Sequence, residues 1–291
     1  MKHLINSMLF LVIALPVLSQ DDFSKMSVRT TPAGGAVYML DGQGGFGGGN
    51  VAVSVGVDGV LLVDNMYVPM MAKVKDAIKS LSDKPIRYVI NSHFHSDHIG
   101  GNNELRPATI VAHENLRKRL VAANTASRPT NHLLPDFTFT DKSNIYFNGE
   151  EVRLIHLPSG HTDTDVVTHF TGSNVVHLGD MFFFGMFPAV YTQGGGNLKQ
   201  LIANLDQVVT WLNPDTKVIP GHGDLATFED LKAYVSMLKA TTAIVEDGIK
   251  KGKTLEQMTS EKVLAAYDTL GSGGAQTTDQ YLAMLYKLLK G

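Results

Sequence analysis

The chain has 291 residues, of which 44% are hydrophobic and 18% are charged, and its formal net charge at pH 7 is −3. This size and hydrophobic content predict a globular protein with a sizeable core, built as one large domain or as two closely packed halves. The interspersed charges exclude the basic stripe of a nucleic-acid-binding protein and the polybasic patch that binds anionic lipid. We therefore expect a small-molecule substrate and no nucleic-acid partner, while the oligomeric state stays open.

The first twenty residues have the pattern of a secretory signal peptide. Lys2 gives a positive start, residues 8–15 form an apolar run, and Ser19 is a small residue at a suitable cleavage position. The apolar run is well short of the ~20 residues that a membrane span needs. We expect residues 1–20 to be a signal peptide (about 1–19 removed), a periplasmic or secreted mature protein, and no membrane attachment after cleavage.

Cysteine is absent from the whole chain. The mature protein therefore has no disulfide bond, no thiolate nucleophile and no sulfur ligand for a metal ion. Any metal site must be built from nitrogen and oxygen atoms.

Hydrophobic patterns predict strands and helices in alternation along the chain. After a polar stretch over residues 21–33, we expect strands at 36–40, 50–65 (with a hairpin turn at Asp58-Gly59), 87–91, 108–112, 145–147, 151–157, 165–170, 174–180 and 216–220. Helices are expected at 68–82, 197–212 and 227–252. Such a pattern packs as two sheets flanked by helices. We assign residues 21–253 to one domain and 254–291 to a C-terminal extension of two helices around a Gly/Ser break at 271–275.

A glycine-rich segment, "DGQGGFGGGN" at residues 41–50, lies between two of the expected strands. Nucleotide-binding glycine motifs are followed directly by a helix, and no helix follows here. We interpret the segment as a mobile hairpin tip that carries Phe46.

The segment "SHFHSDHIGG", residues 92–101, places three of the chain's eleven histidines at the end of an apolar strand. His93 and His95 are alternate residues of an extended segment, so both imidazoles point to one side and can converge on one ion. Asp97 and His98 follow as the chain turns into a helix and can face a second ion. Side chains at such strand ends point into the crevice where α/β proteins place their sites.

Three further candidate ligands, His161, Asp180 and His222, each follow an apolar strand and a glycine. Together the five imidazoles and two carboxylates suit zinc, and also iron or manganese. The remaining histidines of the mature chain are expected to satisfy structural hydrogen bonds, with one of them at a helix start: His113, His132, His156, His169 and His177.

The ordered pattern "HFHSDH", "GHT", "LGD" and "PGHG" resembles the metallo-β-lactamase superfamily over roughly residues 35–225. The resemblance implies an α/β fold, the four-layer αβ/βα sandwich, with a dinuclear zinc site between the sheets. By this resemblance the first ion would be held by His93, His95 and His161, and the second by Asp97, His98 and His222. Asp180 would bridge the ions, and Asp64 would orient a ligand histidine.

The resemblance also implies a zinc-dependent hydrolase in which a metal-bridging hydroxide opens an amide or ester carbonyl, with Asp97 as the catalytic carboxylate. The commonest exported β-lactamases of this superfamily have a cysteine at the position of Asp180 and a lysine at that of Phe183. An aspartate bridge is instead typical of glyoxalase II, lactonases and other ester or thioester hydrolases. We expect β-lactamase-like activity, with lactone or (thio)ester hydrolysis as the alternative.

The substrate pocket and two alternative roles can also be considered. The aromatic run at residues 181–191 is expected to form part of the core and part of the pocket wall, with Phe46 and Phe183 as substrate contacts. Asn197 either offers an amide to substrate or caps the helix that follows it. A mononuclear iron dioxygenase of the same fold would not need all of the proposed ligands, and a non-catalytic descendant would commonly have lost some of them.

Overall fold

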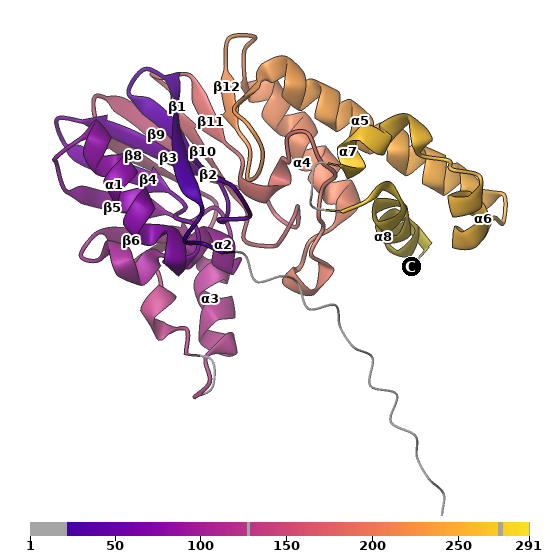
Figure 1. Ribbon diagram of the computed structural model, residues 1–291, viewed down its shortest axis with the longest axis horizontal. Coiled ribbons are helices and arrows are strands. Elements are labelled where there is room, and N and C mark those ends of the chain that lie inside the picture. Colours follow the sequence, from indigo (N-terminus) through magenta and orange to yellow (C-terminus); the bar gives the residue numbers. More distant parts are fainter. Residues whose placement is uncertain (1–21, 127–128, 273–275, 291) are drawn as a thin grey trace, which may run out of the picture.

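The structure is a computed structural model that describes residues 22–126, 129–272 and 276–290. The predicted signal peptide lies outside the described residues. Within those ranges no helix has the length and apolar character needed to cross a membrane. Two β-sheets lie face to face, and helices cover their outer faces (Figure 1).

The first sheet has seven strands in chain order: β1 (Ser27–Gly34), β2 (Val37–Gln43), β3 (Val51–Gly56), β4 (Gly59–Val63), β5 (Ile86–Ile90), β6 (Thr109–His113) and β7 (Phe137–Phe139). The strands from β1 to β4 pair antiparallel, and those from β4 to β7 pair parallel. The parallel half therefore sends several strand ends to one edge, which is where an α/β protein collects functional side chains.

The second sheet has six strands in the order β13-β12-β11-β10-β9-β8: β8 (Lys142–Phe147), β9 (Glu150–His156), β10 (Val166–Phe170), β11 (Val175–His177), β12 (Lys217–Ile219) and β13 (Ala226–Thr227). Only β11 and β12 pair parallel, and the other neighbours are antiparallel.

The helices are α1 (Met71–Leu81), α2 (Ser96–Ile99), α3 (Glu114–Ala123), α4 (Leu198–Trp211), α5 (Phe228–Lys250), α6 (Leu255–Ser260), α7 (Asp268–Gly271) and α8 (Thr278–Lys290). Single 3₁₀ turns lie at Val68–Met70, Asn102–Leu105, Asn131–Leu133, Gly179–Met181, Thr192–Gly194 and Ala265–Tyr267. The predicted helices at 68–82, 197–212 and 227–252 are all present.

Three apolar layers hold the fold together. Successive residues of a strand point to opposite faces, so along β4 Leu61 packs between the sheets while Leu62 packs toward α1 and its Val74. A third cluster joins the outer face of the second sheet to α4 and α5, where Leu205 and Leu238 are fully buried. The layer order of helix, sheet, sheet and helix confirms the predicted αβ/βα sandwich.

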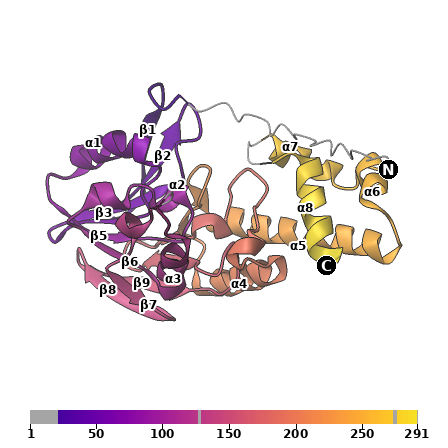
Figure 2. The same ribbon diagram turned by 90° about the horizontal axis from the view of Figure 1, so that it is seen from below.

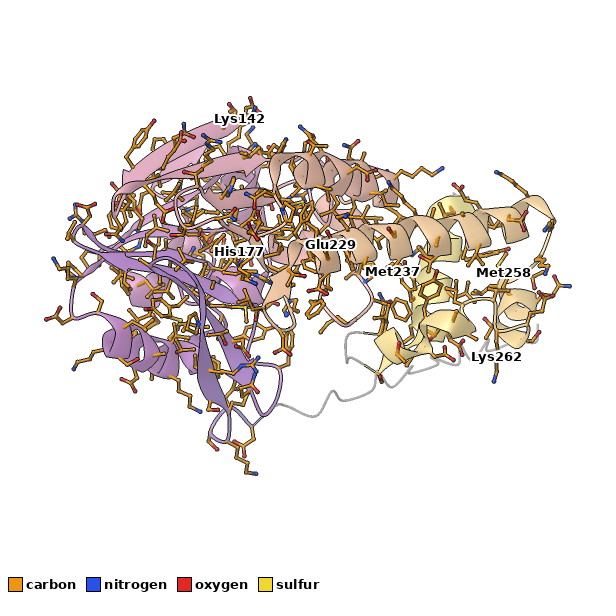
Figure 3. The ribbon with its side chains drawn as sticks, turned by 90° about the horizontal axis from the view of Figure 1, so that it is seen from above. Lys142, His177, Glu229, Met237, Met258 and Lys262 are labelled. Carbon is orange, nitrogen blue, oxygen red and sulfur yellow. The ribbon has the colours of Figure 1, made fainter. Side chains whose placement is uncertain are left out.

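The C-terminal helices gather around the far half of α5, away from the sheets (Figure 1, Figure 2). Met258 of α6 packs against α5 at Gly248, where a Cβ atom would lie only 2.2 Å from the Met258 methyl (Figure 3). Tyr281 of α8 is fully buried, donates or accepts a 2.8 Å hydrogen bond with Thr241 of α5, and stacks on Phe187 with ring centroids 4.1 Å apart. The extension therefore shares one apolar core with α5 and with the segment that carries Phe187.

Two features of the fold differ from the predictions. The polar stretch over residues 21–33 contains β1, an edge strand whose side chains are mostly exposed or half-buried, so it lacks the apolar alternation of a covered strand. The C-terminal extension has three helices rather than two, because α6 and α7 both precede the predicted break at 271–275. The segments β7 and β13 are too short to produce a recognisable pattern.

Candidate metal centre

The seven candidate ligands lie at strand ends on one edge of the sandwich, between the two sheets. His93 and His95 follow β5, Asp97 and His98 lie in the single turn α2, and the other three come from the second half of the chain. Of those, His161 lies between β9 and β10, Asp180 in the turn after β11, and His222 after β12. The fold thus brings together every side chain that the sequence grouped as a ligand.

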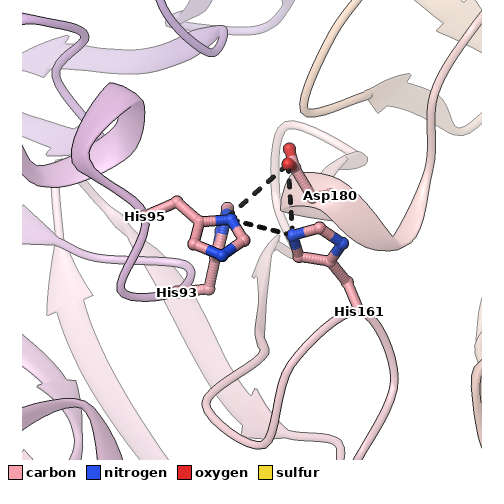
Figure 4. A group of neighbouring side chains, drawn as sticks. All are labelled: His93, His95, His161 and Asp180. Carbon is pink, nitrogen blue, oxygen red and sulfur yellow. Dashed lines mark hydrogen bonds and ion pairs between the residues drawn. The ribbon is translucent and has the colours of Figure 1, made fainter. Parts of the chain in front are cut away.

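The first ligand group consists of His93, His95, His161 and Asp180, whose ligand atoms lie within 4.8 Å of one another (Figure 4). His95 Nδ1 lies 3.1 Å from His93 Nε2 and 3.0 Å from His161 Nε2. Asp180 Oδ2 lies 3.6 Å from His93 Nε2 and 3.4 Å from His161 Nε2. A tetrahedral zinc ion with bonds of about 2.0–2.1 Å separates its ligand atoms by roughly 3.3 Å, so these spacings fit one ion.

The second group consists of Asp97, His98 and His222, and the other oxygen of Asp180 faces it. Asp180 Oδ1 lies 3.0 Å from His98 Nε2 and 3.3 Å from His222 Nε2. Asp97 Oδ2 lies 3.5 Å from His98 Nε2 and 3.4 Å from His222 Nε2. These distances also match the edge of a tetrahedron around a single ion.

Two buried atoms of the second group have no hydrogen-bond partner. His98 Nε2 and Asp180 Oδ1 are only 3.0 Å apart, yet neither is oriented to form a hydrogen bond with the other. An unsatisfied buried polar atom is costly, and two such atoms aimed at the same point indicate a missing common partner. A divalent ion bound by both atoms would satisfy them, so the residues present fit the metal that the ligand set implies.

Asp64 supports the centre from behind His98. Its Oδ2 accepts a 2.7 Å hydrogen bond from His98 Nδ1 and a 2.5 Å hydrogen bond from the hydroxyl of Ser92, while Oδ1 accepts one from the Ser92 amide. The Ser92 hydroxyl also lies 3.0 Å from His93 Nδ1. This network leaves Nε2 of His98 directed at the second group. Ser92 was missed from the sequence, because one serine beside a histidine carries no signal of its own.

The two groups differ in protonation without metal. Burial lowers the pKa of His93 well below its usual range and lowers that of His95 to about 4. Burial also opposes the charged forms of His98 and His222, but the carboxylates around them outweigh it. The pKa of His98 is therefore raised well above its usual value, and that of His222 is raised to about 9.

Glycines allow the backbone to close around the second group. A Cβ on Gly221 would lie 2.1 Å from Asp180 Oδ1, and a Cβ on Gly49 would lie 2.1 Å from the His98 ring. The glycine-rich segment at 41–50 connects β2 and β3, as the sequence predicted, and its Gly49 amide donates to the carbonyl of Asp97. Its close contact with the centre could not be predicted from its composition.

A cavity of about 920 Å³ opens above the centre. Its floor is formed by ligand residues, and its walls by the glycine-rich segment and by residues 183–191. Phe46 and Phe183 both line it and stack on His222, with ring centroids 5.2 and 5.3 Å from that imidazole. The two aromatic residues that the sequence proposed as substrate contacts therefore lie where a substrate would bind.

Asn197 does not line this cavity. Its side chain accepts a 3.0 Å hydrogen bond from the amide of Gln200 and caps α4. Asn197 therefore caps a helix and does not offer its amide to a substrate. His113 likewise caps α3 and stacks on His156 with ring centroids 3.5 Å apart. His177 is buried in β11 and bonds to the backbone of Asn50 and Gly179 (Figure 3). His132 and His169 lie outside both ligand groups.

Comparison with known protein families shows which family has this fold and this ligand pattern. The family model described as the metallo-beta-lactamase superfamily matches residues 44–223, well over half of the chain. The chain belongs to the metallo-beta-lactamase superfamily. The match spans all seven candidate ligands and ends before α5, so the C-terminal helices lie outside it.

Relatives within the metallo-beta-lactamase superfamily are distant. The chain is 27% identical over 160 residues to a hydroxyacylglutathione hydrolase of Pelagibacter ubique (strain HTCC1062), covering 52% of this chain and 58% of that one. It is 22% identical over 183 residues to the metallo-beta-lactamase type 2 of Bacillus cereus, covering 62% of this chain and 69% of that one. The alignment thus spans little more than half the length of the first relative.

Solved structures of the superfamily show the same fold. A metallo-beta-lactamase from Pontibacter korlensis superposes with a TM-score of 0.62 at 17% sequence identity, covering 73% of this chain and 99% of that chain. The superfamily and its α/β fold are therefore common to this chain and these relatives.

Proposed function

We propose that the protein is an exported, dinuclear metal-dependent hydrolase that opens amide or ester carbonyls. The observation that supports this best is the position of Asp180, whose two oxygens face different ligand groups. Oδ2 lies near His93 and His161, and Oδ1 lies near His98 and His222. One carboxylate shared between two histidine-rich groups is suited to bridge a pair of ions.

The nitrogen and carboxylate ligands suit zinc, and iron or manganese as well. His93, His95 and His161 would hold one ion, and Asp97, His98 and His222 the other, with Asp180 between them. When bound, such a pair supplies Lewis acidity that promotes ionisation of water and stabilises negative charge on a carbonyl oxygen.

Asp97 is the residue of this chain best placed to move a proton. Its carboxylate lines the cavity and contacts His98 and His222 through one oxygen. In the proposed reaction the oxygen of water bonds to the carbonyl carbon, and Asp97 accepts the proton that water loses. The C–N or C–O bond then breaks, and Asp97 returns the proton to the departing nitrogen or oxygen. Phe46 and Phe183 shield His222 from solvent.

β-Lactam hydrolysis is the first substrate class to consider, since strained cyclic amides need no protein nucleophile and Bacillus cereus metallo-beta-lactamase type 2 is a relative. Phe183, however, offers no charge to a drug carboxylate. Lactone or ester opening is the second candidate, and the aromatic and aliphatic cavity wall favours it. The similarity to hydroxyacylglutathione hydrolase adds thioesters to the same group.

We propose export on the basis of the sequence of residues 1–20. The test is mass spectrometry of protein recovered from an expressing cell. A mature chain that begins close to Gln20, in the periplasm or the medium, would support export. A chain that retains Met1 and stays in the membrane would show that the segment is not a cleaved signal.

The proposed reaction is tested by metal analysis and a hydrolysis panel on one zinc-loaded preparation. We expect about two zinc equivalents per chain, falling to about one in His222→Ala. The panel compares a penicillin, a carbapenem, an acyl-homoserine lactone and a glutathione thioester. Oxygen uptake by the iron-loaded protein, without hydrolysis of any panel member, would instead identify a mononuclear iron dioxygenase. Metal binding with neither hydrolysis nor oxygen uptake would indicate a non-catalytic role.

A further inference from the structure

The charge of the cavity lining points to the kind of substrate that the centre accepts. Among the residues that the structure describes, no lysine or arginine lines the cavity. Four carboxylates do line it: Asp41, Asp97, Asp180 and Asp224. Asp97 and Asp180 belong to the ligand groups, whereas Asp41 and Asp224 lie on the walls above them.

Arg29 does not line the cavity, and it is bonded to both wall carboxylates. Its guanidinium donates to both oxygens of Asp41, at 3.1 and 3.0 Å, and also to Asp224. Asp41 is buried, with 5% of its surface exposed, so Arg29 could leave it only at the cost of an unpaired buried charge. The Nε and Nη2 groups of Arg29 are therefore held by Asp41 and Asp224.

Arg119 is the second arginine, and it is engaged in the same way. It forms a paired hydrogen bond with Asp163, at 2.6 and 2.7 Å, and its guanidinium lies 5.2 Å from the ring centre of Phe94. Such a bidentate and stacked arginine is held in place on both sides. It approaches the cavity wall near Gln193 without lining the cavity.

The rest of the wall is largely apolar. Phe184, Met186, Val190 and the exposed edge of Phe46 line the cavity beside the ligand floor. Burying a chain of several methylene groups against such a wall is favourable by roughly 0.8 kcal/mol per CH₂. An anionic group held against that wall would lose water and face Asp41 and Asp224, whose two negative charges share the single positive charge of Arg29.

We propose that the centre acts on carbonyl substrates whose apolar arm is uncharged or cationic, and that it disfavours substrates whose arm ends in a carboxylate. This rests on the proposed hydrolase function and narrows it, because penicillins, carbapenems and glutathione thioesters all carry carboxylates. The substrates that remain as candidates are neutral esters, neutral lactones and their cationic analogues.

The turnover test uses three 4-nitrophenyl esters with the same four methylene groups in the acyl chain, on the zinc-loaded protein: the hexanoate, the adipate half-ester and the 5-(trimethylammonio)pentanoate. They differ only in a terminal methyl, carboxylate or quaternary ammonium group. We expect kcat/KM for the hexanoate to exceed that for the adipate half-ester at least tenfold, and the cationic ester to equal or exceed the hexanoate. An adipate half-ester that reacts as fast as the hexanoate would overturn the proposal.

A binding test separates this inference from the hydrolase proposal. The matching primary amides are titrated into metal-free protein labelled with ¹³C at the methionine methyl groups, and the Met186 signal is assigned with Met186→Leu. We expect the neutral and cationic amides to shift that signal at lower concentration than the carboxylate-bearing amide. If this order holds while no ester is hydrolysed, the charge preference stands and the hydrolase proposal fails. If the carboxylate-bearing amide binds best, the charge preference is wrong.

Two charge-reversal variants test whether the wall carboxylates cause the charge preference. Asp224→Lys inverts one wall charge, and Asp215→Lys makes the same change on an exposed turn at the other end of β12. We expect Asp224→Lys to raise the adipate-to-hexanoate ratio of kcat/KM at least threefold and Asp215→Lys to leave that ratio unaltered. An unaltered ratio in Asp224→Lys, or an equal rise in both variants, would contradict selection by the wall carboxylates.

Discussion

Gly49 lies so close to His98 that a methyl group on residue 49 would lie 2.1 Å from the Cε1 atom of the imidazole. Gly49→Ala should therefore displace the His98 ring, lowering the affinity of the second ligand group for zinc and destabilising the protein by about 1–3 kcal/mol. Gly47→Ala is the control in the same segment, because its nearest neighbours are the flexible ends of Met26 and Met70. Zinc titration against a competing chelator measures the difference. Equal affinities in the two variants would show that His98 can move aside.

Asp64→Asn should weaken metal binding while leaving the backbone intact. Asp64 has a φ of 64°, a left-handed conformation that asparagine also tolerates. Asparagine has a single acceptor oxygen, so it cannot accept both from the Ser92 amide and from His98 Nδ1 on opposite sides of the group. If its NH2 group faces Nδ1, His98 loses its fixed orientation. We expect a roughly 10- to 100-fold loss of zinc affinity with little change in thermal stability. A large fall in melting temperature with normal zinc affinity would assign Asp64 a purely structural role.

The two ions should differ in the protons that they displace. Burial lowers the pKa of His95 to about 4 and that of His93 well below its usual value, which favours their neutral forms. Nearby carboxylates raise the pKa of His222 to about 9 and that of His98 well above its usual value, which favours their protonated forms without metal.

Only a neutral imidazole binds zinc, so the second equivalent should release more protons than the first and bind more tightly as the pH rises toward 9. Calorimetric titrations in buffers of different ionisation enthalpy measure this release. Equal release for both equivalents would contradict the difference between the two groups.

Asp180→Ala should lower activity roughly 100-fold or more, because both ligand groups lose their shared carboxylate. His177→Ala is the comparison, three residues earlier on the same strand end. His177 bonds to the backbone of Asn50 and Gly179, so its loss should cost about 2 kcal/mol of stability while zinc binding persists. Comparable losses of zinc in both variants, at unchanged folding, would mean that the strand end is misassigned.

Tyr281→Ala should alter the cavity from a distance. It removes the ring that stacks on Phe187, in the segment that forms one cavity wall, and should destabilise the protein by about 3–5 kcal/mol. Tyr281→Phe keeps the stack and loses the hydrogen bonds of the hydroxyl to Thr241 and to the sulfur of Met237, at a cost of about 1 kcal/mol. Denaturation curves and KM for the hexanoate ester measure both effects. A KM that rises equally in both variants would show that the stack does not support the wall.

The sequence predicted the elements whose apolar residues repeat with a regular period, such as α5 and the covered strands. It also grouped the seven ligand candidates, since each follows a strand and strand ends meet at one edge. It could not predict β1, whose edge position leaves its side chains exposed. Nor could it predict the contact of Gly49 with His98, or the engagement of Arg29 by Asp224, because these pair segments that are distant in the chain and carry no local pattern.

The stack of Phe187 on Tyr281, together with the hydrogen bond from the Gln276 side chain to the carbonyl of Pro188, has a consequence for engineering. Residues 182–191 cannot be transplanted alone into a relative that lacks α8, because Phe187 would then be an unsupported aromatic side chain. An exchange of substrate range between superfamily members should succeed only when this segment and the C-terminal helices are moved as one cassette.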